Sequence, residues 1–174
     1  MAGWGETARG LVKPIPEMAD DLKDDLSELS DVEAIHFEEL VKVKGPSGNT
    51  PKCVDCMAQY KSRMYMIEFK PLQCQGDDVI RESLALKAVE SAHIYGRFLR
   101  EEFGDLDLGF ILVTQDHRQG IVETFRRRAG MDSSGDLARY SKRDEDGNIM
   151  FYDMVEMYGC DDFVRIAEKR FRHR

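Results

Sequence analysis

The chain has 174 residues, of which 42% are hydrophobic and 33% are charged, and its formal net charge is −8 at pH 7. This length and composition predict one domain with its own hydrophobic core and exclude a disordered chain. No apolar run approaches the roughly 18 residues that a membrane span needs, so we expect no membrane association. The negative charge argues against general affinity for nucleic acid, which needs a positive surface.

The residues at the start of the chain and the cysteines suggest a compartment. Residues 1–18 lack the basic start and the apolar stretch of a secretory signal. Four cysteines are too few for a disulfide scaffold. We therefore expect a cytoplasmic protein with reduced thiols.

The first third of the chain predicts one helix and one strand. Residues 1–13 show no periodicity, and we expect them to form an N-terminal arm. Residues 33–44 predict a single short strand, since the run FEELVKVK alternates in part. Residues 45–51 form a loop by composition. A helix over residues 16–29 is predicted by the apolar spacing of Met18, Leu22, Leu26 and Leu29.

The middle of the chain predicts a β-hairpin, a long helix and a buried strand. The runs CVDCMAQ (53–59) and MYMIEFK (64–70) are typical of strands, and Pro71 ends the second. A helix from Asp77 to about Phe103 follows, with Gly104 as its stop. The short apolar run LGFILVT (108–114) predicts the strand.

The C-terminal part predicts further helices and one strand. We expect a helix over residues 117–129, a strand over 148–158 and a terminal helix capped by Asp161. This order of elements predicts an α/β fold with a mixed central β-sheet flanked by helices. Residues 1–174 would then form a single domain, with a core over 14–115 and an extension of that core over 116–174.

The register of the hairpin indicates where chemistry could occur. A turn centred on Lys61 and Ser62 sets Met57 opposite Met66 and Asp55 opposite Glu68. Lys70 shares the face of Glu68, because side chains alternate along a strand. Opposed carboxylates repel, and a divalent cation such as Mg²⁺ or Mn²⁺ would relieve that repulsion.

An adjacent lysine could hold a water or stabilise developing negative charge. The trio of Asp55, Glu68 and Lys70 therefore predicts metal-assisted hydrolysis of a phosphodiester. The alternative is that these residues are ordinary surface charges paired as a salt bridge.

Asp55 and the tripeptide Glu68-Phe69-Lys70 at the end of a hydrophobic strand resemble the motif of the PD-(D/E)xK nuclease superfamily. The order helix, strand, hairpin, long helix and strand over residues 16–115 supports this resemblance. The runs IEFKPLQ, RESLALKAVESAHIY and FYDMVEMYGCDDFVRIAEKRF are similar to those of uncharacterised bacterial or phage members. One departure is Val54, which stands where the motif has a proline.

The resemblance implies a restriction-endonuclease-like fold, with Asp55 and Glu68 as metal ligands and Lys70 serving the attacking water. The function it implies is that of a metal-dependent nuclease. The alternative is a catalytically silent binding or regulatory module on the same fold, since a fold does not determine function. Nucleic acid and a protein partner both remain compatible with the sequence.

The superfamily often adds an acid from the first helix, and Asp25 borders the apolar stripe of that predicted helix. Glu39 is the rival if the following strand supplies the ligand. Lys87 on the long helix could reach a phosphate, or its stem could lie over the core. The remaining candidate nucleic-acid contacts, which could equally form a solvated helix face, are Arg126, Arg127 and Arg128.

A zinc site is a further hypothesis, for an interaction module stabilised by metal. Cys53-x-x-Cys56 with Cys74 and His117 has ligand types that bind zinc. In a strand, however, positions 53 and 56 point to opposite faces and cannot share an ion without an intervening turn.

Overall fold

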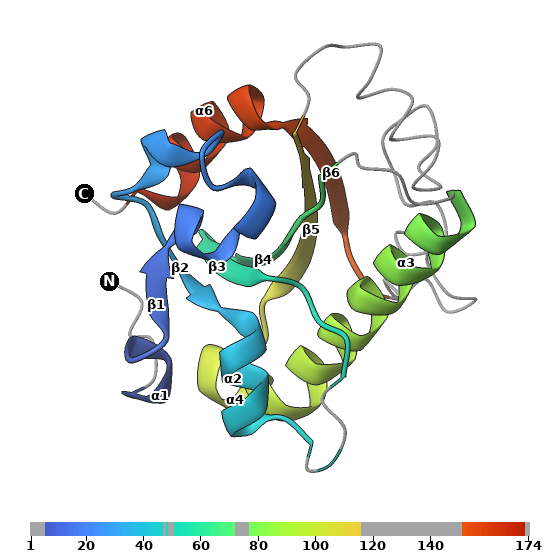
Figure 1. Cartoon of the computed structure of the whole chain (residues 1–174). Helices are drawn as coiled ribbons and strands as arrows, with labels where there is room; N and C mark the ends of the chain where they lie inside the picture. Colours follow the sequence, from blue (N-terminus) through green and yellow to red (C-terminus); the bar gives the residue numbers. More distant parts are fainter. Residues whose placement is uncertain (1–5, 47, 49–50, 72–76, 116–150, 173–174) are drawn as a thin grey trace.

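The computed structural model describes residues 6–46, 48, 51–71, 77–115 and 151–172. Their strands form one six-stranded sheet in the order β1-β2-β3-β4-β5-β6 (Figure 1). From β1 to β4 each strand is antiparallel to the next, whereas β4, β5 and β6 run parallel to one another. The strands are β1 (Val12–Pro14), β2 (Glu33–His36), β3 (Cys56–Tyr60), β4 (Arg63–Phe69), β5 (Asp107–Thr114) and β6 (Met154–Gly159).

Helices cover both faces of this sheet (Figure 1). On one face, α2 and α3 bury a core that includes Met57, Met66 and Phe110. On the other, α6 and three 3₁₀ turns bury a core that includes Ile67 and Phe163. The helical elements are α1 (Glu6–Arg9), η1 (Ile15–Met18), η2 (Asp20–Leu22), η3 (Ser27–Leu29), α2 (Phe37–Lys44), α3 (Asp77–Ile94), the π-helical segment η4 (Tyr95–Leu99), α4 (Arg100–Phe103) and α6 (Cys160–Phe171).

The predicted α/β class and mixed sheet with flanking helices are confirmed. The hairpin has the predicted register, since Tyr60 pairs with Arg63 and Met57 with Met66 across the turn at Lys61 and Ser62. The long helix is also confirmed, although its hydrogen bonding becomes π-helical over η4 before it ends at Gly104. Strand β5 begins one residue earlier than predicted.

The predicted helix over residues 16–29 is wrong in kind. Its apolar stripe is buried as expected, but the chain forms the separate turns η1, η2 and η3. Asp20 has φ +37°, which no regular right-handed helix accommodates. The acidic and serine residues of this segment also favour turns over helix interiors.

The predicted strand over residues 33–44 is half right. Strand β2 ends at His36, and the run FEELVKVK forms α2. The helix prevails because Phe37, Leu40 and Val41 are buried at helical spacing, whereas Val43, which a strand would bury beside Val41, is 60% exposed.

The ends of the chain differ from the prediction in three places. In place of an arm, residues 6–9 form α1 and residues 12–14 form β1, which pairs with β2. Strand β6 starts at Met154, and the first part of the expected strand, 148–150, lies outside the described residues. Gly159 is the N-cap of α6, so Asp161 lies in its first turn, where an acid complements the helix dipole.

Candidate functional site

The β3–β4 hairpin brings Asp55 and Glu68 together. The ladder ends with Cys56 opposite Ile67, so the next position outward sets Asp55 beside Glu68. The Oδ2 atom of Asp55 accepts a hydrogen bond of 2.7 Å from the backbone N–H of Phe69. This bond holds the Asp55 carboxylate against the C-terminal end of β4.

Glu68 is buried, with only 1% of its surface exposed, and a lysine from α3 compensates its charge. The Lys87 Nζ atom lies 2.8 Å from Glu68 Oε1 and 2.9 Å from Oε2. It also lies 3.5 Å from Asp55 Oδ1. A buried carboxylate is costly without such a partner, so Lys87 is the group that allows Glu68 to be buried here.

The environment of the site shifts the proton affinities of all three groups. Burial, and then the charge of Asp55, raise the pKa of Glu68 to about 8 despite the nearby Lys87. Burial also raises the pKa of Asp55, against the opposing effects of Lys87 and the Phe69 N–H. Burial would lower the pKa of Lys87, but the charges of Glu68 and Asp55 outweigh it and raise that pKa. The two carboxylates therefore favour a bound proton or cation.

The site opens into a cavity of about 430 Å³. Besides Asp55, Glu68 and Lys87, its walls include Lys70 and the η2 acids Asp20 and Asp21. The cavity lies at the C-terminal end of β4, which runs parallel to β5. Ligands of open α/β sheets bind at this edge.

Two of the predicted catalytic side chains, Asp55 and Glu68, are thus in contact with the same ammonium group. Lys70 lines the cavity as well, and its backbone N–H bonds to Val113 on β5. The sequence left two roles open for Lys87, contact with a phosphate or a stem that lies over the core. In the structure its ammonium contacts the carboxylates of Asp55 and Glu68. The alternative of exposed surface charges is wrong for Glu68, because the face of β4 that carries it packs under α3.

The acids expected to join from the first helix and the next element lie elsewhere. Asp25 is exposed and does not line the cavity. The separate 3₁₀ turns place Asp20 and Asp21 at the cavity instead. The spacing of an ideal helix would not direct these two side chains to that side. Glu39 lies on α2 and pairs with Lys42 at 2.6 Å, also outside the cavity walls.

Arg126, Arg127 and Arg128 lie outside the described residues, as do Cys74 and His117.

The spacing of Lys87 and Ser91 on α3 was a usable signal that sequence reasoning missed. These residues are one turn apart, and Ser91 Oγ accepts a 3.0 Å hydrogen bond from the Val54 N–H beside Asp55.

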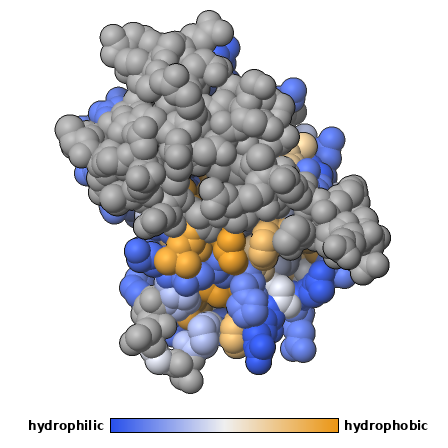
Figure 2. All heavy atoms as spheres, turned by 90° about the vertical axis from the view of Figure 1, so that its right-hand side faces the viewer, coloured by the Kyte–Doolittle hydropathy of each residue, from blue (hydrophilic) through white to orange (hydrophobic). Residues whose placement is uncertain are grey.

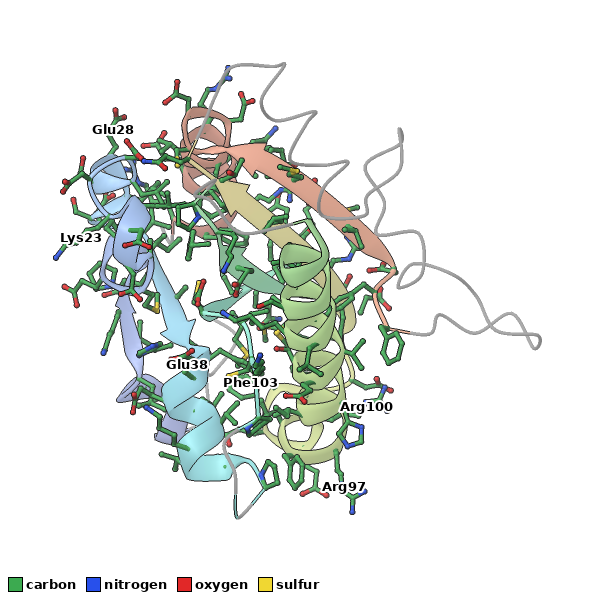
Figure 3. The ribbon with its side chains drawn as sticks, turned by 45° about the vertical axis from the view of Figure 1, so that its right-hand side comes forward. Lys23, Glu28, Glu38, Arg97, Arg100 and Phe103 are labelled. Carbon is green, nitrogen blue, oxygen red and sulfur yellow. The ribbon has the colours of Figure 1, made fainter. Side chains whose placement is uncertain are left out.

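A neighbouring helix adds another negative charge. Glu38 on α2 (labelled in Figure 3) contributes to the raised pKa of Asp55 after burial has had its larger effect. Lys23 and Glu28 of the 3₁₀ segment project away from the sheet in the same view. Glu38 therefore adds negative charge near Asp55 from the side of α2.

The donor set suits a hard cation, although it is small. Within the described ranges, no three His, Cys, Asp or Glu side chains gather closely enough to hold a metal. Mg²⁺ commonly uses one or two carboxylates and takes its other ligands from water and substrate phosphate. Asp55 and Glu68 fit that requirement.

The two cysteines of the Cys53-x-x-Cys56 motif do not share a site. Cys53 and Cys56 are packed into the cores on opposite faces of the sheet, as the strand periodicity predicts. Burial raises the pKa of the Cys53 thiol to about 12 and that of Cys56 well above its ordinary value. Both are therefore neutral thiols without thiolate character at physiological pH.

Two other hollows of the described structure have different linings. One, of about 580 Å³, lies between Tyr60, Tyr158 and the basic side chains of α6. Another, of about 690 Å³, is mostly apolar and includes Val89 and Phe98. Figure 2 shows apolar side chains bordered by hydrophilic ones on the side of the molecule that carries α3.

Comparisons with known proteins found no matching family model, no similar curated protein and no matching solved structure. None of the helices in the described part of the chain has the length and apolar character needed to cross a membrane.

Proposed function

We propose that this protein is a metal-dependent phosphodiester hydrolase, a nuclease of the PD-(D/E)xK type. The observation that carries the proposal is the juxtaposition of Asp55 and Glu68 at the end of β4, in a cavity that Lys70 also lines. The order of helical turns, β2, the β3–β4 hairpin, α3 and β5 supports a restriction-endonuclease-like arrangement. The buried, unpaired Cys53, Cys56 and Cys160 suit a cytoplasmic protein.

Asp55 and Glu68 would hold Mg²⁺ or Mn²⁺ through carboxylate oxygens. A bound metal of this kind polarises a phosphoryl oxygen and lowers the pKa of a water ligand. Lys70 and Lys87 supply positive charge from the cavity walls, where their partial burial strengthens their attraction for a phosphate. Asp20 and Asp21 face the same space and add to the field that attracts the cation.

The test is cleavage of single- and double-stranded DNA and RNA with Mg²⁺ or Mn²⁺. Asp55→Asn and Lys70→Met are expected to lower the rate by about 10²–10³-fold. Asp25→Asn and Lys23→Met are matched controls, because both residues are exposed and lie outside the cavity. Absence of cleavage by the wild type under all these conditions, or full activity of both site variants, would contradict the proposal.

A second candidate is a catalytically silent binding module on the same fold. One observation favours it: the Lys87 ammonium already pairs with both oxygens of Glu68, so the buried charge is balanced without a metal. Such a protein would bind nucleic acid or a protein without cleaving a phosphodiester, and Mn²⁺ would leave its melting temperature unchanged.

A further inference from the structure

The three carboxylate oxygens that face one another across the site all point to a single ammonium group. Glu68 Oε1 and Oε2 lie 2.8 and 2.9 Å from Lys87 Nζ, and Asp55 Oδ1 lies 3.5 Å from it. The fourth oxygen, Asp55 Oδ2, accepts the Phe69 N–H instead. Each oxygen that could bind a metal between the two carboxylates is therefore already directed at Lys87.

A divalent cation cannot simply be added to this arrangement. Mg²⁺ binds oxygen at about 2.0–2.1 Å, so an ion shared by Asp55 and Glu68 would lie in the space that the Lys87 ammonium occupies. Two positive groups at that separation repel strongly beside the buried Glu68 carboxylate. Metal and ammonium are thus alternatives.

We infer that Lys87 is the resident cation of the metal-free site, and that a divalent metal enters by displacing its ammonium from Glu68 and Asp55. This inference rests on the proposed function. It assigns to Lys87 a control over metal loading that the motif residues Asp55, Glu68 and Lys70 do not provide.

The cavity offers space for the Lys87 side chain once it is displaced from the carboxylates. Lys87 is 20% exposed, lines the cavity and has a flexible four-carbon stem. Lys70 lines the same cavity. After exchange, both ammonium groups would face the cavity, and this pair of cations suits the phosphate of a nucleic-acid backbone.

The first measurement is Mn²⁺ affinity by electron paramagnetic resonance, for the wild type, Lys87→Met and Lys70→Met. Removing the competing ammonium should tighten Mn²⁺ binding by about tenfold or more in Lys87→Met. Lys70→Met is the matched control: the charge of Lys70 also acts on Glu68, but the Lys87 ammonium lies 2.8 Å from it, so removing Lys70 should tighten Mn²⁺ binding much less than removing Lys87.

The second measurement uses the wild type alone and so does not depend on how Lys87→Met folds. Acetylation by acetic anhydride, read by mass spectrometry, should modify Lys87 several-fold faster with Mn²⁺ than without it. Lys169, which is exposed on α6, should react equally in both conditions.

These results separate the inference from the proposed function. Tight Mn²⁺ binding that is equal in the wild type and Lys87→Met, with unchanged Lys87 labelling, would overturn the inference and leave the nuclease proposal standing. Failure of all three proteins to bind Mn²⁺ would overturn both.

Discussion

The backbone N–H of Phe69 donates to Asp55 Oδ2 at 2.7 Å, which ties the residue before β3 to the last residue of β4. A carboxylate so placed has two separate tasks. One oxygen completes the hydrogen bonding of the hairpin end, and the other faces Lys87. Structural and chemical roles of Asp55 can therefore be separated by choice of substitution.

Asp55→Ala should lower the free energy of unfolding by about 1–3 kcal/mol, because it removes the acceptor of the Phe69 N–H. Asp55→Asn keeps an acceptor oxygen and should stay closer to the wild type in stability while losing cleavage. Urea denaturation of both variants measures the difference. Equal loss of stability in the two would show that the hydrogen bond does not carry the effect.

Glu68 should make the stability of the metal-free protein fall as pH rises. Burial raises its pKa from 4.5 to about 8 in the folded protein. Between pH 4.5 and about 8, the folded state therefore retains a proton that the unfolded state has released. This contribution is complete below about pH 4.5 and is lost as pH rises through about 8, with a slope of up to about 1.4 kcal/mol per pH unit.

Urea denaturation in EDTA between pH 5 and 8 measures that slope. Glu68→Gln should flatten it, whereas Glu28→Gln, at an exposed position, should not. A divalent metal should also reduce the slope, since it favours the ionised carboxylate that the metal-free site disfavours. Identical pH dependence in the wild type and Glu68→Gln would rule Glu68 out as the source.

Ser91→Ala should lower the stability of the protein by removing a hydrogen bond beside the site. Its Oγ is the acceptor for the buried Val54 N–H, and α3 carries Lys87 one turn earlier. An unpaired buried N–H costs about 1–3 kcal/mol. Thermal unfolding of Ser91→Ala measures this loss, with Ser30→Ala as an exposed control that should stay within about 0.5 kcal/mol of the wild type. No difference between the two variants would contradict the role of Ser91.

Asp20 combines an unusual backbone with a position on the cavity wall. Its φ of +37° favours Gly, Asn or Asp, so Asp20→Asn tests the charge at little backbone cost, whereas Asp20→Val should cost about 1–2 kcal/mol. If the carboxylate helps to attract the cation, Asp20→Asn should weaken Mn²⁺ binding. Asp24→Asn, which alters an exposed acid outside the cavity, should not.

The hairpin could be predicted from sequence because its determinants are local. Side chains alternate along a strand, and a two-residue turn fixes which residues pair. Lys61 supplies the positive φ, +57°, that tight hairpin turns need. The positions of Asp55 and Glu68 follow directly from this register.

The role of Lys87 could not be predicted in the same way. It depends on how α3 packs over the end of β4. This is a tertiary contact, and the periodicity of apolar residues along α3 gives little information about it. The 3₁₀ turns that bring Asp20 and Asp21 to the cavity escaped prediction for a related reason. The spacing of apolar residues predicts which side chains are buried. It does not predict whether they lie on one continuous helix or on separate turns.

Strand β1 also bears on how the protein behaves at high concentration. It is only three residues long, it contains Lys13 and ends in Pro14, and it forms one border of the described sheet. A short border strand with a charged side chain and a missing N–H is a poor template for an incoming chain. Self-association by strand addition is therefore disfavoured at this border, which should help the protein to remain monodisperse during purification.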